Sequence, residues 1–330
     1  MSIAHSNISI FVPHIGCPNM CSFCNQRHIT GKKSAPKVQD VVDAVNIAVA
    51  SKNYNPETTE IAFFGGSFTA INRNYMIRLL KTAYQFVNSG KVLGIRISTR
   101  PDAIDDEILL LLKQYGVTSI ELGAQSLNDN VLKCNNRGHS SIDVINASKL
   151  IKAHGFSLGL QMMTGLYGDC DEYAIYTANE IIKLQPDTVR IYPTIVLKNT
   201  DLAALYSDGV YRPQSLEDAV SICAKLLQMF NEANIKVIRL GLHSIEDDSY
   251  VAGPWHPAFS ELCTSMIYLN NAQSLLNEKG SYVLYVNPKS ISKMIGQQKQ
   301  NIITLKNLGF DCIVKSDDTL LEHEIKAERR

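Results

Sequence analysis

Short apolar runs alternate with longer amphipathic segments along the first 240 residues of the chain. The apolar runs are rich in β-branched or aromatic residues, which indicates buried strands, and the segments between them repeat apolar residues at helical spacing. The predicted strands are Ile8–Val12, Glu60–Phe64, Lys91–Ser98, Val117–Leu122, Phe156–Met162 and Thr188–Tyr192. The predicted helices are Val38–Ser51, Asn72–Asn88, Ile104–Tyr115, Ser141–His154, Glu172–Leu184 and Leu216–Ala233.

Strict alternation of apolar strands with helices predicts a parallel sheet joined by right-handed crossovers. Six such units are too few to close a (β/α)8 barrel, so we expect an α/β fold that forms an open, partial (β/α)6 barrel. Its functional groups should lie at the carboxyl ends of the strands. Lys236–Leu240 is a candidate for a short seventh strand.

The pattern changes after a turn-rich link at Asp247–Pro257, which holds the single tryptophan, Trp255. The elements predicted beyond it are a long helix, a strand, a short helix, a tight turn, a helix and a strand, at Phe259–Glu278, Ser281–Val286, Ser290–Ile295, Gly296–Gln300, Asn301–Leu308 and Phe310–Lys315. The order strand–helix–turn–helix–strand is that of a KH-type RNA-binding unit. We therefore predict two domains, a barrel over residues 1–245 and a small α+β, KH-like lobe with its leading helix over residues 246–330.

Three cysteines follow the first predicted strand with the spacing C-x3-C-x2-C, at Cys17, Cys21 and Cys24. Thiolates are the usual protein ligands of iron–sulfur clusters, and four of them complete a [4Fe–4S] cubane. With only three in the loop, one iron is left open for a small molecule. Zinc is the alternative, and it needs a fourth ligand, for which His14 and His28 are nearest.

Further candidates lie in or after the other predicted strands. Gly65 and Gly66 follow the second strand, where missing side chains let a ligand approach the backbone, although a plain turn also explains them. Arg137 is able to pair with a carboxylate through two hydrogen bonds, although a lone surface arginine is the commoner case. Gln125 ends the fourth strand and Gln161 lies in the fifth, where their amides can hydrogen-bond a polar ligand.

Basic and amide side chains surround the turn in the C-terminal part. Lys289, Lys293 and Lys299 flank the turn that begins at Gly296. Such side chains, around a turn that exposes backbone N–H groups, suit a nucleic acid backbone, whereas the bland alternative is a solvated helix–helix corner. A KH turn carries Gly-x-x-Gly, and the second glycine is replaced here by Lys299.

Composition describes an ordinary globular protein, with 45% hydrophobic and 19% charged residues. Lys and Arg together number 32 and so do Asp and Glu, so net charge gives no global attraction to nucleic acid or membrane. We expect no signal peptide and no membrane span, hence a cytoplasmic protein. The five remaining cysteines are scattered singly and are expected to be reduced structural thiols.

The three-cysteine loop resembles that of the radical S-adenosylmethionine (SAM) superfamily, in which an aromatic residue such as Phe23 commonly precedes the last cysteine. More narrowly, the chain resembles the radical SAM region of the elongator catalytic subunit, which modifies the wobble uridine of tRNA. Five runs carry this resemblance, in order, between residues 8 and 240: Phe64–Phe68, Thr99–Asp102, Gly123–Ser126, Asn136–His139 and Ile191–Thr194.

The resemblance implies two cofactors, a [4Fe–4S] cluster and SAM, which the cluster cleaves to a 5′-deoxyadenosyl radical. Related oxygen-independent coproporphyrinogen oxidases suggest further SAM contacts, which fall on Phe11, Gly65, Gly66, Gln125 and Arg137 of this sequence. Two positions where those relatives carry an acid, at the ends of the third and fifth strands, are Ser98 and Gln161 here. We find no acetyl-CoA-binding run, so acetyl transfer is not expected unless a partner supplies it.

The sequence therefore predicts a radical SAM enzyme that acts on RNA, with tRNA as the expected kind of RNA. We expect it to receive electrons from a donor such as flavodoxin or ferredoxin. One alternative is a radical SAM enzyme for a small molecule, of the coproporphyrinogen-oxidase type. An alternative of another class is an RNA-binding protein whose metal loop is purely structural. Metal content separates this last alternative from the other two.

Overall fold

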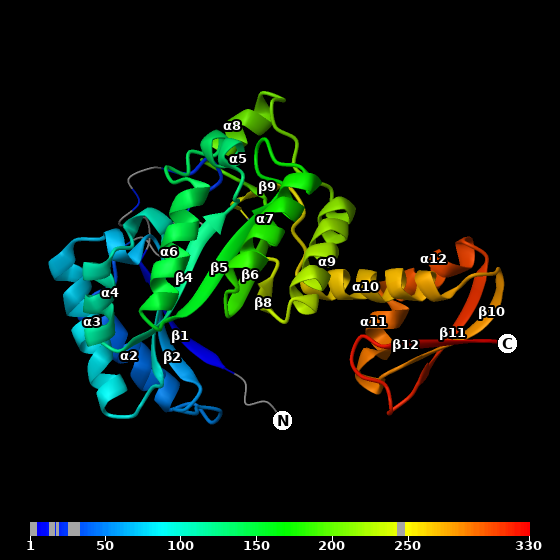
Figure 1. Cartoon of the computed structure of the whole chain (residues 1–330), viewed down its shortest axis with the longest axis horizontal. Helices are drawn as coiled ribbons and strands as arrows, with labels where there is room; N and C mark the ends of the chain where they lie inside the picture. Colours follow the sequence, from blue (N-terminus) through cyan, green and yellow to red (C-terminus); the bar gives the residue numbers. More distant parts are fainter. Residues whose placement is uncertain (1–4, 13–16, 18–19, 26–33, 243–247) are drawn as a thin grey trace.

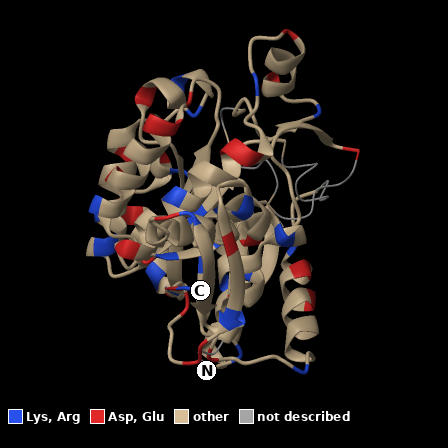
Figure 2. Cartoon of the chain, turned by 90° about the vertical axis from the view of Figure 1, so that its right-hand side faces the viewer, with Lys and Arg blue, Asp and Glu red and all other residues tan. Residues whose placement is uncertain are grey.

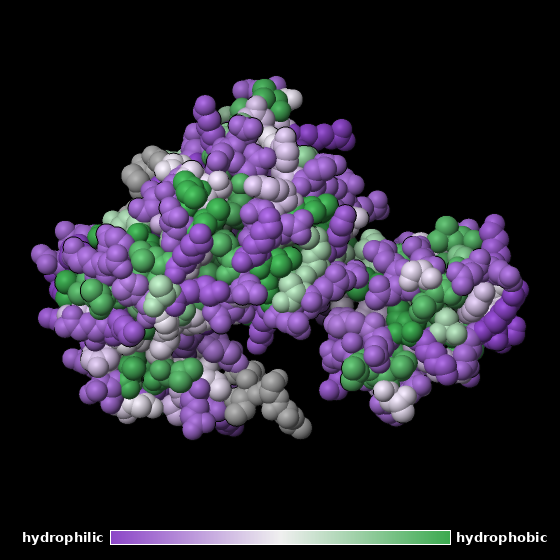
Figure 3. All heavy atoms as spheres, in the orientation of Figure 1, coloured by the Kyte–Doolittle hydropathy of each residue, from purple (hydrophilic) through white to green (hydrophobic). Residues whose placement is uncertain are grey.

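The structure is a computed structural model that describes residues 5–12, 17, 20–25, 34–242 and 248–330. Figure 1 shows two parts, a large sheet with its helices and a small C-terminal lobe, joined by the long helix α10 (Phe259–Leu275). The lobe stands away from the large part below α10, and the space-filling view shows an open notch between them (Figure 3). No helix among the described residues is long and apolar enough to cross a membrane.

Within the described residues, seven parallel strands form the large sheet in the order β1-β2-β3-β4-β5-β6-β8. The sheet is curled, and its two outer strands, β1 and β8, do not pair with each other. The barrel is therefore open, a half-barrel, as predicted. The candidate seventh strand is present as β8. The bounds are Ser6–Val12 for β1, Thr59–Gly65 for β2, Gly94–Thr99 for β3, Val117–Gln125 for β4, Ser157–Thr164 for β5, Thr188–Pro193 for β6 and Lys236–Leu240 for β8.

Six helices of the barrel match the predicted ones and pack on the apolar face of the sheet, where Phe63, Leu79 and Ile120 belong to one continuous core. Several of these helices begin directly after a residue whose side chain caps the helix. Asn72 accepts a hydrogen bond from Tyr75 N, and Asp105 accepts one from Ile108 N, so each closes the free amino end of a helix. These helices are α2 (Val38–Val49), α3 (Arg73–Asn88), α4 (Asp106–Gln114), α6 (Ser141–Ala153), α7 (Asp171–Leu184) and α9 (Leu216–Glu232).

Short elements that the sequence did not indicate lie in the connections. Figure 1 places α5, α8 and β9 together at one end of the half-barrel. The short elements are α5 (Asp129–Cys134), α8 (Asp201–Ser207), β7 (Val196–Leu197), β9 (Tyr250–Ala252), and the 3-10 turns η1 (Phe68–Ala70) and η2 (Pro101–Ala103). Each spans too few residues to show a hydrophobic period.

A row of buried and half-buried charges crosses the other face of the sheet from β2 to β6. Arg96 Nε donates to Glu60 Oε2 at 2.8 Å, and Arg96 Nη1 donates to Glu121 Oε1 at 3.1 Å. Arg190 Nε lies 2.8 Å from the second oxygen of Glu121. Burial alone would raise the pKa of Glu60, but the hydrogen bond from His5 and the charge of Arg96 lower it to about 2. The floor of the half-barrel is therefore polar and paired.

The C-terminal lobe has a separate core, centred on Tyr268, Leu284 and Leu305. Its parallel pair β10–β11 is joined through two short helices, which confirms the predicted order, and β12 adds an unpredicted antiparallel edge. Helix α10 packs on both parts: Phe259 and Cys263 belong to the barrel core, and Tyr268 to the lobe core. The remaining bounds are β10 (Gly280–Val286), η3 (Pro288–Ser290), α11 (Ile291–Ile295), η4 (Gln297–Lys299), α12 (Gln300–Asn307), β11 (Phe310–Ser316) and β12 (Ile325–Arg329).

Candidate cofactor site at the barrel rim

The three clustered cysteines lie beyond the carboxyl end of β1, where each is half-exposed and none forms a disulfide with another described residue. Cys17 Sγ is 3.9 Å from the hydroxyl of Ser67, which lies two residues beyond the end of β2. The described residues contain no group of three His, Cys, Asp or Glu side chains already arranged around one metal position. The alternative zinc ligands His14 and His28 lie outside the described residues. The fit of a metal cluster is therefore judged from the donor set and its surroundings.

Ser22, between the second and third cysteines, ties their loop to the segment that follows α5. Its N–H donates to the carbonyl of Asn135 at 3.2 Å, and its hydroxyl donates to Asn135 Oδ1 at 2.8 Å. The amide of Asn135 in turn donates to the carbonyls of Val131 and Tyr167. Asn135 is fully buried, with 0% exposure, and all these bonds are short. The sequence analysis did not single out Asn135, because its partners are remote in the chain.

A second support comes from the segment between β6 and α9. Leu202 N, at the start of α8, donates to the carbonyl of Ser22 at 2.7 Å. Phe23 packs beside a small apolar cluster formed by Val196, Leu202 and Tyr211. The aromatic residue next to the last cysteine thus anchors the loop in the fold.

Arg137 lies directly against the cysteine loop. Its Nη1 is 2.9 Å from Cys21 Sγ, and its Nη2 donates to the carbonyl of Gly123 at 2.6 Å. Arg100 donates to the backbone carbonyl of Arg137 and pairs with Asp102, so it acts as a support for this segment. Arg137 Nε is buried and has no partner among the described residues. The unused donor of the guanidinium is available to an anion.

The end of β4 brings Gln125 beside Arg137. A Cβ atom at Gly123 would lie 3.1 Å from Gln125 Nε2 and 3.4 Å from Arg137 Nη2, so the glycine makes room for both side chains. Gln125 has a positive φ of 64°, and its Oε1 is buried without a partner among the described residues. Ser98 Oγ, on β3, is unpaired in the same way. Buried polar atoms without partners are rare and call for a ligand or water.

The other predicted SAM contacts lie on the same face of the sheet. Gln161 donates through Nε2 to Glu121 Oε2 at 3.1 Å, which fixes the orientation of its amide. The Phe11 ring is 6.4 Å from the ring of Phe64, itself under the guanidinium of Arg190.

The glycine pair has a packing role of its own. A Cβ atom on Gly65 would lie 3.0 Å from the carbonyl oxygen of Val12, and Gly65 has a φ of 107°. Gly66 N donates to the same carbonyl at 2.6 Å. Close approach of β1 to β2 therefore already requires Gly65 to be a glycine.

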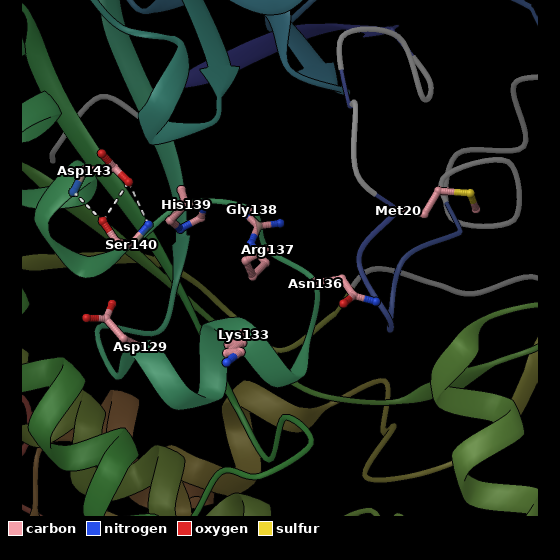
Figure 4. Close-up of a pocket in the computed structure, with 9 residues that line it drawn as sticks. All are labelled: Met20, Asp129, Lys133, Asn136, Arg137, Gly138, His139, Ser140 and Asp143. Carbon is pink, nitrogen blue, oxygen red and sulfur yellow. Dashed lines mark hydrogen bonds between the residues drawn. The ribbon is translucent and has the colours of Figure 1, made fainter.

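A cavity of about 790 Å³ opens beside the rim (Figure 4). Met20, from the cysteine loop, forms one side of it, and Arg137, Gly138 and His139 form the other. His139 is 8% exposed, and its Nδ1 has no partner among the described residues. Burial and the charge of Arg137 lower the pKa of His139 to about 4, so its ring is neutral near pH 7.

The predicted RNA-binding residues lie in the lobe, apart from this rim. Lys293 lies in the middle of α11, Gly296 begins the turn, and Lys299 leads into α12. Lys299 has a φ of 64°, so it adopts the left-handed conformation for which a second glycine is favoured. Lys289 lies in η3. Figure 2, which looks onto this end of the molecule, shows basic and acidic residues interspersed rather than gathered in one field.

The rim fits a sulfur-ligated cluster with a polar molecule beside it. Three thiols lie on one loop and a guanidinium contacts one of them. Two buried oxygens at neighbouring strand ends have no partner within the described part of the chain. Thiolates hold iron–sulfur clusters, and unpaired buried donors and acceptors hold the polar groups of a ligand.

Comparison with known proteins agrees with this fit. The model of the radical SAM superfamily matches residues 11–181, and that of a radical SAM C-terminal domain matches residues 186–268. Elongator complex protein 3 of Homo sapiens is 31% identical over 198 residues, which cover 53% of this chain and 36% of that protein. A tRNA uridine(34) acetyltransferase of Dehalococcoides mccartyi is 23% identical over 239 residues, or 62% of this chain and 52% of the relative.

The fold is also found in a solved structure. Archaeal Elp3 of Methanocaldococcus infernus, with residues 1–46 deleted, superposes with a TM-score of 0.67 at 21% identity. The superposition covers 82% of this chain and 63% of the archaeal chain. The match spans about a third of the length of the human relative and about half of the bacterial one.

Proposed function

Because this chain belongs to the radical SAM superfamily and is an enzyme that uses a [4Fe–4S] cluster and SAM, we propose that its substrate is an RNA, and tRNA in particular. Two relatives whose names state a place in elongator or an action on tRNA uridine support this proposal. The strand–helix–turn–helix–strand order of the lobe, with lysines on both sides of the turn, supports it further.

Cys17, Cys21 and Cys24 are the proposed ligands of the cluster. When bound, the cluster and SAM together supply a 5′-deoxyadenosyl radical, which removes a hydrogen atom from the substrate or adds to it. The ligand loop stays in place through the bonds between Ser22 and Asn135. An external electron donor such as flavodoxin or ferredoxin belongs to the proposal.

The residues at the strand ends are the proposed contacts of SAM. Arg137 offers its free Nε–H to the carboxylate, and the unpaired oxygens of Ser98 and Gln125 accept from the amino or hydroxyl groups. The backbone at Gly66, the ring of Phe11 and the amide of Gln161 complete the set on the same face, with Gly65 in support.

The observation that carries the cofactor assignment is the contact of the Arg137 guanidinium with the Cys21 thiol, beside buried oxygens that have no partner. One residue thereby joins the cluster loop to the strand end where SAM is proposed to bind. The same contact holds the half-buried side chain of Arg137 at the rim.

Metal content after anaerobic reconstitution tests this function. Protein with all three cysteines should hold about four iron and four sulfide per chain, the cubane stoichiometry. Cys17→Ala, Cys21→Ala and Cys24→Ala should each lose the cluster absorbance, whereas Cys134→Ala, at an exposed thiol outside the loop, should keep it. Stoichiometric zinc without iron in anaerobically produced protein would contradict the enzyme and favour a structural metal loop.

A further inference from the structure

The turn between α11 and α12 has an unusual backbone. Gly296, Gln298 and Lys299 have φ values of 79°, 51° and 64°. For residues with a side chain the left-handed region costs about 1–2 kcal/mol each, and it persists where the surroundings hold it. Two such residues in succession indicate a turn whose shape is imposed by its neighbours.

Asn301 imposes that shape. Its side chain is 5% exposed, and its Nδ2 lies 2.9 Å from the carbonyl of Ser265 and 3.1 Å from that of Met294. A Cβ atom on Gly296 would lie 3.0 Å from the backbone nitrogen and the Cγ of Asn301. Helices α10, α11 and α12 therefore meet at one buried amide, and the turn is a fixed surface.

A cavity of about 220 Å³ lies between this turn and the first turns of α10. Its lining is mixed: Ala258 and Leu262 are apolar, and Glu261, Lys293 and Gln297 are polar. A nucleobase has two apolar faces and an edge of donors and acceptors, so it matches a cavity with an apolar wall and a polar rim.

The turn itself suits the phosphate that accompanies such a base. The backbone N–H groups of Gln297 and Gln298 donate to no acceptor among the described residues. Lys293 lines the cavity, and Lys299 is exposed within the turn. Free N–H groups and lysines are the usual contacts of a nucleic acid backbone.

We propose that this cavity receives one unpaired base of an RNA strand whose phosphates lie along residues 296–300. The inference rests on the proposed action on RNA and adds the form of the RNA at the lobe. A base must leave its helix to enter, so the lobe selects a loop or single strand over a duplex.

Filling the cavity tests the inference without changing any charge. Ala258→Leu in the full chain should bind a fluorescent single-stranded RNA octamer at least about tenfold more weakly than the parent, while its affinity for a 16-base-pair RNA duplex stays unchanged. Asn270→Leu, at an exposed position on the same helix, is the matched control and should bind both RNAs as the parent does. A nucleoside monophosphate alone should bind far more weakly than the octamer, because it lacks the neighbouring phosphates.

Crosslinking gives a readout that does not depend on the variant. Ultraviolet crosslinking of a 4-thiouridine octamer to the parent, followed by mass spectrometry, should mark residues 258–265 or 293–297. Parental affinity of Ala258→Leu for the octamer, or crosslinks only elsewhere, would overturn the inference while leaving the RNA substrate intact. If the parent binds neither octamer, duplex nor tRNA, the proposed function itself fails.

Discussion

Each of the two candidate sites is a loop held by one buried asparagine. At the barrel rim, Asn135 fixes the cysteine loop through Ser22, and in the lobe, Asn301 fixes the turn against α10. At the rim, buried polar atoms of Ser98, Gln125 and Arg137 have no partner among the residues that the structure describes, whereas the side chains of Gln297, Gln298 and Lys299 in the lobe turn are exposed. Buried unpaired atoms demand a ligand of matching shape, while an exposed turn suits a polymer backbone. The same structural arrangement therefore supports both proposals, a small cofactor at the rim and RNA at the lobe.

The largest effect is expected from breaking the rim anchor. Asn135→Ala leaves the Ser22 hydroxyl and the carbonyls of Val131 and Tyr167 without their partner, which should cost about 3 kcal/mol in the free energy of unfolding. Chemical denaturation measures this loss, and iron analysis should show a cluster that no longer persists. Asn130→Ala, exposed on the same short helix, should change neither quantity. If Asn135→Ala retains the full cluster, Asn135 is not needed to hold the cysteine loop in place.

Arg137 tests the ligand side of the rim. Arg137→Ala removes the free donor and should weaken SAM binding by roughly 1.5–3 kcal/mol, the range for a hydrogen bond to a charged group. Calorimetry on the reconstituted protein measures this, and Arg212→Ala, at an exposed arginine, is the control. If the affinity for SAM is unchanged, Arg137 only supports the cysteine loop and does not bind SAM.

The lobe should respond to salt, and the rim should not. Changing Lys293 and Lys299 together to Glu should weaken tRNA binding about tenfold at low salt and flatten its dependence on salt, because each phosphate contact releases counterions. SAM binding should stay at the parental level, since both lysines lie in the C-terminal lobe and not at the barrel rim. Parental tRNA binding across a salt series would make the lobe structural.

The smallest effect is a pH dependence confined to the rim. Burial holds the pKa of His139 at about 4, below its value in the unfolded chain, so the unfolded state binds more protons between about pH 4 and 6.5. Stability should therefore fall by about 1 kcal/mol from pH 7 to about pH 5.5, and His139→Gln should remove that part of the slope. His323→Gln, at an exposed histidine of the lobe, should leave the slope unchanged.

The sequence predicts the repeating part of the molecule well. The strands and helices of the barrel and the strand–helix–turn–helix–strand order of the lobe follow from hydrophobic periods, which each element carries within itself. It does not predict α5, α8 or β12, because these are short or lie at an edge. The roles of Asn135 and Asn301 depend on partners far away in the chain, such as Ser22 and Ser265, so no local pattern contains them.

In the candidate site too, local features could be predicted from the sequence and long-range contacts could not. The spacing of Cys17, Cys21 and Cys24 identifies the ligand loop, because the chemistry lies within eight residues. The contact of Arg137 with Cys21 joins residues 116 positions apart and needed the fold. At Lys299 the sequence pattern argued against a feature that the fold has. The second glycine of the turn is missing, yet the backbone at Lys299 adopts the left-handed form, because Asn301 holds the turn.

Formation of 5′-deoxyadenosine with and without tRNA tests the central claim most directly. Anaerobically reconstituted protein, given SAM and a reductant, should release 5′-deoxyadenosine slowly alone and faster with bulk tRNA. The increase should be smaller at limiting tRNA when Lys293 and Lys299 are changed to Glu. The same slow rate with tRNA and without it would contradict an RNA substrate, and absence of 5′-deoxyadenosine in both would contradict the assignment of the rim.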